Sequence, residues 1–135
     1  MRLVRLRQHN VDEKDWAWLE VGLKSMPYGY DLNSTMEDLM AGMLQFWRLE
    51  GEAEGILLTR IMEHPWIREL EVVTMAGKGV VKNLHLIYQA LKSEGRNLGC
   101  KVIGGDVSDK RLLRKYTRLG AKPIAVKMVM EISDG

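Results

Sequence analysis

The sequence is poor in the features that mark specialised classes of protein. Its one cysteine, Cys100, excludes an internal disulfide and a metal site built on paired thiolates. The 20 basic and 18 acidic residues nearly cancel to a net charge of +2, which does not indicate binding to nucleic acid. No apolar run approaches the roughly 18–20 residues that cross a bilayer, and no apolar run after a charged start suggests a signal peptide. These absences predict a cytoplasmic protein that does not span a membrane.

Metal ligands and linkers are equally sparse. The three histidines, His9, His64 and His85, are far apart and have no cysteine or acidic partner at the spacing of metal ligands, so we predict no metal site. No stretch rich in proline or serine divides the chain. At 135 residues, of which 46% are hydrophobic, the sequence has the size and composition of one globular domain over residues 1–135.

Hydrophobic periodicity divides the chain into strands and helices. Apolar residues that alternate with polar ones predict strands, and apolar residues three or four positions apart predict amphipathic helices. Strands are predicted at residues 2–7, 45–50, 55–62, 67–75, 101–107 and 124–132, and helices at residues 12–25, 34–43, 79–94 and 109–119. The order β-α-α-β-β-β-α-β-α-β indicates an α+β domain with a mixed central sheet flanked by four helices.

Two of these elements carry clear local signals. Asp12 and Asp15 have the spacing of a capping box at the start of the first helix. The last predicted strand has a large apolar residue at every second position, namely Ile124, Val126, Met128, Met130 and Ile132. This alternation predicts a strand with one buried face.

The most informative segment follows the strand at 67–75, where Gly77, Lys78 and Gly79 lead directly into a helix. Glycines let a turn expose several backbone N–H groups, and a helix N-terminus adds about half a positive charge. The segment would therefore suit a phosphate or pyrophosphate group. A plain strand-to-helix turn that needs flexible glycines explains the same residues, and the spacing matches neither a Walker loop nor a dinucleotide-binding turn.

Together with the order of elements, this segment resembles the GNAT superfamily of N-acetyltransferases. The acetyl-CoA loop of the family reads Gln/Arg-x-x-Gly-x-Gly/Ala, and Gly79 aligns with its central glycine while Gly77 and Lys78 fill the variable positions. A second stretch, residues 109–121, is similar to the family's Asn-x-x-Ala-x-x-x-Tyr-x-x-x-Gly-Phe, with Tyr116 and Gly120 as matches. The resemblance implies a GNAT-like fold over nearly the whole chain.

The resemblance also implies a reaction, the CoA-dependent transfer of an acyl group to an unknown amine, with acetyl-CoA as cosubstrate. It makes Tyr116 the candidate acid that protonates the leaving thiolate, and Glu69 and Glu71 the candidate bases. A core tyrosine and two solvated carboxylates are the alternatives. The acceptor pocket would be shaped by the first two helices and the loop at 26–35. The residues implied in cofactor binding are Val73, Met75, Gly77, Lys78, Gly79, Val80, Val81, Lys82 and Asp109.

Three positions depart from the family pattern. Ala76 stands where Gln or Arg is usual, Val81 where Gly or Ala is usual, and Ala121 where an aromatic residue is usual. Short members of this kind are similar to GNAT-like proteins encoded by bacteriophages, some of which are virion components. The alternative hypothesis is therefore a catalytically silent GNAT-like protein that binds a protein partner, forms a homodimer, or takes part in assembling a virion.

Overall fold

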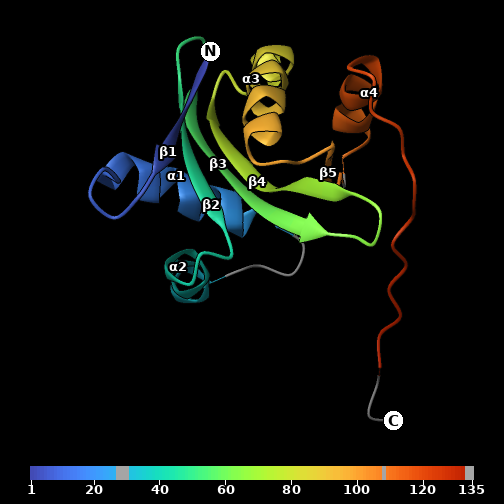
Figure 1. Cartoon of the computed structure of the whole chain (residues 1–135), viewed down its shortest axis with the longest axis horizontal. Helices are drawn as coiled ribbons and strands as arrows, with labels where there is room; N and C mark the ends of the chain where they lie inside the picture. The colour runs from blue at the N-terminus through green and yellow to red at the C-terminus, as the bar shows by residue number, and fades with distance from the viewer. Residues whose placement is uncertain (27–30, 108, 133–135) are drawn as a thin grey trace.

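The computed structural model describes residues 1–26, 31–107 and 109–132. Five strands, one short 3-10 turn and four helices are formed in these described parts (Figure 1). In chain order the elements are β1 (Arg2–Leu6), α1 (Glu13–Lys24), α2 (Leu32–Met40), β2 (Gln45–Glu50), β3 (Glu54–Glu63), β4 (Arg68–Lys78), η1 (Val81–Asn83), α3 (Leu84–Asn97), β5 (Val102–Gly105) and α4 (Lys110–Arg118).

The strands form one mixed sheet in the order β1-β2-β3-β4-β5. The first four strands are antiparallel neighbours, and β5 pairs with β4 in parallel after the crossover through α3. This architecture confirms the predicted α+β class and the mixed central sheet flanked by four helices. Two predicted boundaries are wrong, because β4 continues to Lys78 instead of ending at residue 75, and α3 begins at Leu84 instead of residue 79.

The sheet has a hydrophobic core on each face because successive strand residues point to opposite sides. In β3, Leu57 belongs to the core under α3, whereas Ile56 and Leu58 belong to the core under α1. Figure 1 shows the same layers, with α1 behind the sheet and α3 in front of it. The helix α4 packs against the α3 core through Leu112, Tyr116 and Leu119.

The first helix begins where the local sequence predicts. Asp12 caps α1, with its side chain accepting from the Asp15 N–H at 3.0 Å, while the Asp15 carboxylate accepts from the Asp12 N–H at 3.0 Å. This reciprocal pair confirms the predicted capping box. In α3 the buried stripe of Leu84, Ile87 and Leu91 has the spacing of one helix face and covers the sheet.

The strand predicted at 124–132 is not formed. Residues 121–132 follow α4 as an extended segment without a sheet partner, and all of them are exposed. The alternation of apolar residues indicates which way the side chains of a strand would point. A strand also needs a neighbouring strand that satisfies its N–H and C=O groups. No other described strand pairs with this segment, so the predicted sixth strand is wrong for the isolated chain.

The long pairing of β3 with β4 depends on two facing glycines. Gly55 lies opposite Gly77, and a Cβ added to Gly77 would collide with the backbone carbonyl of Glu54 and lie 2.6 Å from Cα of Gly55. Neither strand can carry a side chain at this point without moving the other. The close approach therefore requires glycine for reasons of space.

We expect Gly77→Ala to lower the free energy of unfolding by about 1–3 kcal/mol, because the backbones of β3 and β4 must separate. Urea denaturation measures this loss. Gly95→Ala is the matched control. Gly95 lies in α3, and a Cβ added there would meet Leu70 Cδ2 at an ordinary contact distance of 3.7 Å. The control should be neutral or gain up to about 1 kcal/mol from helix propensity. Equal effects of the two substitutions would contradict the steric argument.

Candidate functional site

The candidate site lies where β4 and β5 separate. Their parallel pairing runs from Glu69 opposite Val102 to Val72 opposite Gly105, and β5 ends there. The strand β4 continues to Lys78, so its second half keeps β3 on one side and has no strand partner on the other among the described residues. Backbone N–H and C=O groups on that side of β4 are available to another molecule.

A β-bulge in β4 coincides with this separation. Leu58 pairs with Thr74 and Thr59 pairs with Val72, so Val73 is an extra residue that has no paired residue on β3. A bulge leaves one residue outside the regular ladder and bends the strand. Its local sequence, Val-Val-Thr, is typical of an ordinary strand, so the bulge has no signal in the sequence.

The side chains around the bulge confirm the change of direction. Val73 packs against the core under α1, and the Thr74 hydroxyl donates to the Gly22 carbonyl of α1 at 3.0 Å. Two consecutive side chains thus face α1. The next residue, Met75, packs against the core under α3. Of the residues implied in cofactor binding, Val73 and Met75 therefore lie on opposite faces of β4.

The turn after β4 leaves its first amides without an acceptor inside the turn. Gly79 has φ +72°, a left-handed conformation that favours glycine. The Asn83 N–H is the first to bond back along the turn, at 3.2 Å from the Gly79 carbonyl and 3.1 Å from that of Val80. The amides of Val80, Val81 and Lys82 come before it, where a helical turn supplies no acceptor of its own.

Asn83 holds this turn against the β2–β3 hairpin. Its side-chain Nδ2 donates to the Gly79 carbonyl at 2.8 Å and to the Glu52 carbonyl at 3.2 Å. The two valines of the turn differ, because Val80 is buried in the α3 core and Val81 is 48% exposed. Gly77 and Lys78 belong to β4, so the turn itself is shorter than the sequence suggests.

The two candidate bases share a face of β4 but are held by different neighbours. Glu71 accepts from Arg60 Nη2 at 3.0 and 3.1 Å, and Glu69 lies 2.7 Å from His64 Nε2. Their side chains are only 20% and 21% exposed. They flank the buried Leu70, which points to the α3 side. Both carboxylates thus lie on the α1 side of the sheet, beside β5, and both already accept hydrogen bonds.

The candidate acid, Tyr116, lies on α4 and packs edge-on against Tyr88 of α3, with ring centroids 5.3 Å apart and planes at 79°. Burial raises the pKa of the Tyr88 hydroxyl, and the neighbouring Tyr116 raises it further. Tyr116 is half-buried and helps to attach α4 to the core. Its position is compatible with either predicted role, acid or packing residue.

Asp109, the remaining residue implied in cofactor binding, caps α4. Its Oδ1 accepts from the Arg111 N–H at 2.7 Å, and the residue is exposed. Of the loop at 26–35 implied in the acceptor pocket, residues 27–30 lie outside the described parts of the chain.

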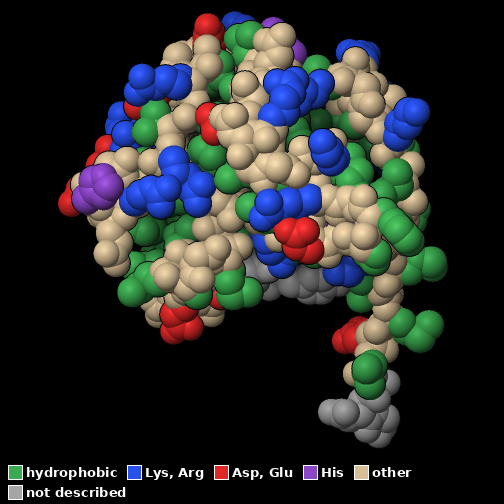
Figure 2. Space-filling view, in the orientation of Figure 1, with side chains coloured by type: hydrophobic (Ala, Val, Ile, Leu, Met, Phe, Trp, Pro, Cys, Tyr) green, Lys and Arg blue, Asp and Glu red, His purple; other side chains and the backbone are tan. Residues whose placement is uncertain are grey.

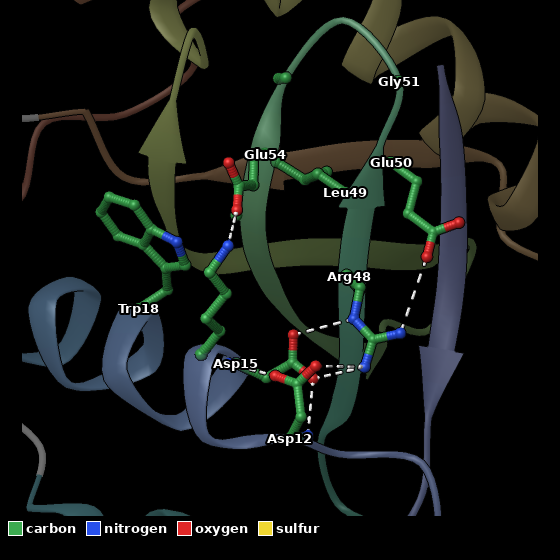
Figure 3. A pocket seen from close by; sticks show the side chains of 11 residues that line it. Asp12, Asp15, Trp18, Arg48, Leu49, Glu50, Gly51 and Glu54 are labelled. Carbon is green, nitrogen blue, oxygen red and sulfur yellow. Dashed lines mark hydrogen bonds and ion pairs between the residues drawn. The ribbon is translucent and has the colours of Figure 1, made fainter.

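A separate hollow of about 350 Å³ lies between the start of α1 and the β2–β3 turn (Figure 3). At its centre Arg48 Nε donates to Asp15 Oδ1 at 3.0 Å, and Nη2 donates to Asp15 Oδ2 at 2.6 Å and to the Asn10 carbonyl at 2.7 Å. Asp12 and Glu50 lie 3.6 and 3.7 Å away from the same guanidinium. These carboxylates raise the pKa of Arg48, chiefly through the hydrogen bonds to Asp15.

Both cations that line this hollow, Lys14 and Arg48, are paired with carboxylates, and the four lining carboxylates leave an excess of negative charge. Lys14 adds a further ion pair with Glu54 at 2.7 Å. The arrangement joins the first turn of α1 to β2, so we interpret it as a structural clamp. Arg48 was not singled out by sequence reasoning, because its hydrogen-bond partners lie 33 or more positions away in the chain. The turn after β4, which carries the amides of Val80, Val81 and Lys82, contacts the same hairpin through the bond from Asn83 to the Glu52 carbonyl.

The described residues contain no group of three or more His, Cys, Asp or Glu side chains able to hold a metal ion. Cys100 is buried, and this burial raises the pKa of its thiol. Within the described parts of the chain, no helix combines the length and the apolar character needed to cross a bilayer.

Comparisons with known proteins find similarity in fold without similarity in sequence. No family model matches the sequence, and no curated protein matches it significantly. Among solved structures, an aminoglycoside acetyltransferase from an uncultured soil metagenomic sample has a TM-score of 0.66 and 12% identity, covering 98% of this chain and 96% of that one. Glucosamine-6-phosphate N-acetyltransferase from Arabidopsis thaliana has a TM-score of 0.64 and 11% identity, covering 98% of each chain.

An acetyltransferase from Trypanosoma brucei is a third example, with a TM-score of 0.61 and 14% identity over 97% of this chain and 99% of that one. Matches that span whole chains at this level show a shared fold. The chain therefore has a GNAT-like α+β fold, as the resemblance implied. At such low sequence identity the structural similarity shows the fold alone. Activity and substrate have to be argued from the site.

We expect Arg48→Met to lower the free energy of unfolding by about 3 kcal/mol, because it leaves the Asp15 carboxylate, 4% exposed, without its cation. Chemical denaturation measures the loss. Arg2→Met is the control, since Arg2 pairs with Glu50 at 3.1 Å but is 74% exposed. That exposed pair should contribute less than about 1 kcal/mol. A loss for Arg48→Met no larger than for Arg2→Met would contradict the clamp.

Proposed function

We propose that the protein is a CoA-dependent N-acyltransferase that transfers an acyl group from acyl-CoA to an amine acceptor. The observation that carries this proposal is the bulge at Val73, which lies where β4 leaves β5 and keeps one edge of β4 free. An acyl-CoA has a long amide-containing arm, and a free strand edge offers such an arm backbone hydrogen bonds. The GNAT-like fold supports the same assignment.

The turn that follows β4 would bind the pyrophosphate of CoA. The amides of Val80, Val81 and Lys82 have no acceptor within the turn, and the N-terminal end of α3 follows at Leu84. Lys78 and Lys82 flank the turn with exposed positive charge. The residues present thus fit an anionic group, with backbone donors supplying most of the contacts.

The proposed reaction needs a proton acceptor, a polarised carbonyl and a proton donor. A neutral amine attacks the thioester carbon, the carbon–sulfur bond breaks, and the amine proton passes to a base. Glu69 or Glu71 would take this proton, directly or through water, on the α1 side of β4. A backbone N–H near the Val73 bulge would polarise the carbonyl. Tyr116 would return a proton to the leaving thiolate.

A catalytically silent GNAT-like protein is the second candidate, and two observations favour it. Val81 places an exposed β-branched side chain beside the amides of the turn, where the family has Gly or Ala. The carboxylates of Glu69 and Glu71 are already engaged by His64 and Arg60. In this case the chain would act by binding a partner, for example in the assembly of a phage particle.

Calorimetric titration with acetyl-CoA distinguishes the candidates. We expect the wild-type chain to bind, and Val81→Gly to bind more tightly because the amides become more accessible, at a cost of about 1 kcal/mol in stability. Val21→Gly is the matched control, since Val21 is a similarly exposed valine on α1. It should lose similar stability and bind as the wild type does. Absence of binding by both the wild type and Val81→Gly would refute the acyltransferase proposal.

Removal of one hydroxyl tests the proton donor. We expect Tyr116→Phe to lower kcat about 100-fold or more, the general scale of losing an acid–base group, while leaving stability nearly unchanged. Tyr88→Phe removes the other hydroxyl of the same aromatic pair and should leave turnover close to the wild-type value. Steady-state kinetics with an amine acceptor found by screening measures both. Retained turnover in Tyr116→Phe would make Tyr116 a packing residue.

A further inference from the structure

The charged residues of the chain are divided unevenly along its length. Residues 78–122, which run from the end of β4 through α3 and β5 to just beyond α4, hold 11 Lys and Arg residues and 3 Asp and Glu residues. Residues 1–77 hold 8 basic and 13 acidic residues. The net charge of +2 therefore conceals an acidic part and a strongly basic part, and such an asymmetry indicates an anionic partner for the basic part.

Seven of these 11 basic residues lie on α3 and α4. Figure 2 views the molecule from the side of these two helices and shows Lys and Arg side chains over both, with few acidic side chains between them. Lys92 and Arg96 follow Tyr88 by four and eight positions, so they lie on the side of α3 where Tyr88 contacts Tyr116 of α4. The cations of α3 thus lie next to α4.

The buried side and the charged side of α4 are separate. Leu112, Tyr116 and Leu119 pack against the α3 core. Another side of the helix carries five exposed cations, namely Lys110, Arg111, Arg114, Lys115 and Arg118. The ion pairs formed among the described residues involve none of these five.

This row of cations costs α4 stability in the free chain. Three pairs of the cations are four positions apart, and like charges at that spacing lie side by side on a helix and repel. The first turn of α4 contains no acidic residue that would offset them. A bound polyanion would remove the repulsion, so the stability of the helix itself favours such a partner.

An extended chain of phosphates fits this surface better than a single anion does. The cations from Lys110 to Arg118 span about 12 Å along α4, and those of α3 lie beside them, so one phosphate group contacts only a few of them. Three of the five cations on α4 are arginines, whose planar guanidinium binds a phosphate through two parallel N–H bonds. A nucleic acid offers one phosphate for every nucleotide, and its charge density is correspondingly high.

The structure favours a nucleic acid over an anionic membrane. A helix that binds the surface of a bilayer needs an apolar side that enters the boundary between headgroups and acyl chains. The apolar side of α4 is already occupied, because Leu112, Tyr116 and Leu119 pack against the α3 core. The side that remains accessible carries the cations.

We propose that Lys92 and Arg96 of α3 and the five cations of α4, together called the basic face, bind the phosphate backbone of a nucleic acid. Because the contacts go to phosphates, the binding is largely independent of base sequence and weakens as the salt concentration rises. The proposal does not depend on acyl transfer, since the basic face contains none of the residues proposed to bind CoA or to move a proton.

Fluorescence anisotropy with a labelled RNA of about 20 nucleotides, and with duplex DNA of the same sequence, measures this binding. We expect at least one probe to bind with a micromolar or lower Kd at about 50 mM salt, and with a Kd about 100-fold higher at about 200 mM, the change that four phosphate contacts produce. The combined variant Arg111→Gln, Arg114→Gln, Arg118→Gln should bind at least about 10-fold more weakly and lower the slope of log K against log salt by about 2–3. Its unfolding midpoint should stay the same or rise, because repulsion within α4 is removed.

The combined variant Arg2→Gln, Lys14→Gln, Lys24→Gln is the matched control. These three residues are exposed and lie outside the basic face, so the net charge falls by the same amount while the basic face is unchanged. The control should bind both probes as the wild type does. Absence of binding of either nucleic acid by the wild type at about 50 mM salt would overturn the proposal, as would equal losses in the two combined variants. Stronger binding of phosphatidylserine vesicles or of polyglutamate than of either nucleic acid would also overturn it, because the basic face would then serve a membrane or an acidic protein.

Discussion

The interruption of pairing at the Val73 bulge controls the part of the fold where function is expected. Up to Val72, β4 is paired on both sides; from Thr74 onward it is paired with β3 alone among the described strands. An extra residue turns the strand, and the parallel neighbour β5 ends at the same level. The backbone N–H and C=O groups on that side of β4 are therefore left for water or for a ligand that offers backbone-like hydrogen bonds.

Several other features keep this bent strand in place. Thr74 is bonded to α1 through the Gly22 carbonyl, and a Cβ on Gly22 would come 2.9 Å from the Thr74 hydroxyl oxygen, so α1 and β4 approach closely. The clamp of Arg48 and Asp15 joins the first turn of α1 to β2. On the other face the α3 core covers Leu70. The bulge is therefore supported from both sides of the sheet.

The ends of the sheet have different roles. The edge at β1 is short and carries Arg2 and Arg5, whose charges discourage pairing with another strand. The edge at β5 has no comparable charge within the strand, and the chain contains an apolar segment of strand character close to it in sequence. The two edges of the sheet thus differ in how strongly their own side chains discourage pairing with another strand.

Much of the fold could be predicted from local patterns. The stripe of α3, the capping box of Asp12 and Asp15, and the first five strands depend on residues near one another in sequence, and periodicity records which face each residue buries. The GNAT-like class followed from the order of these elements together with the motifs around Gly79 and Tyr116.

The features that only the tertiary structure decided depend on residues far apart in the sequence. The bulge at Val73 exists only in the register with β3, Gly77 belongs to a strand because Gly55 lies opposite, and Arg48 is a clamp because Asp15 is folded against it. The segment at 124–132 has every local property of a strand but pairs with no described strand, since strand formation requires an edge as well as a pattern. Local sequence determines which face a residue prefers, and long-range hydrogen bonding determines whether that face is ever covered.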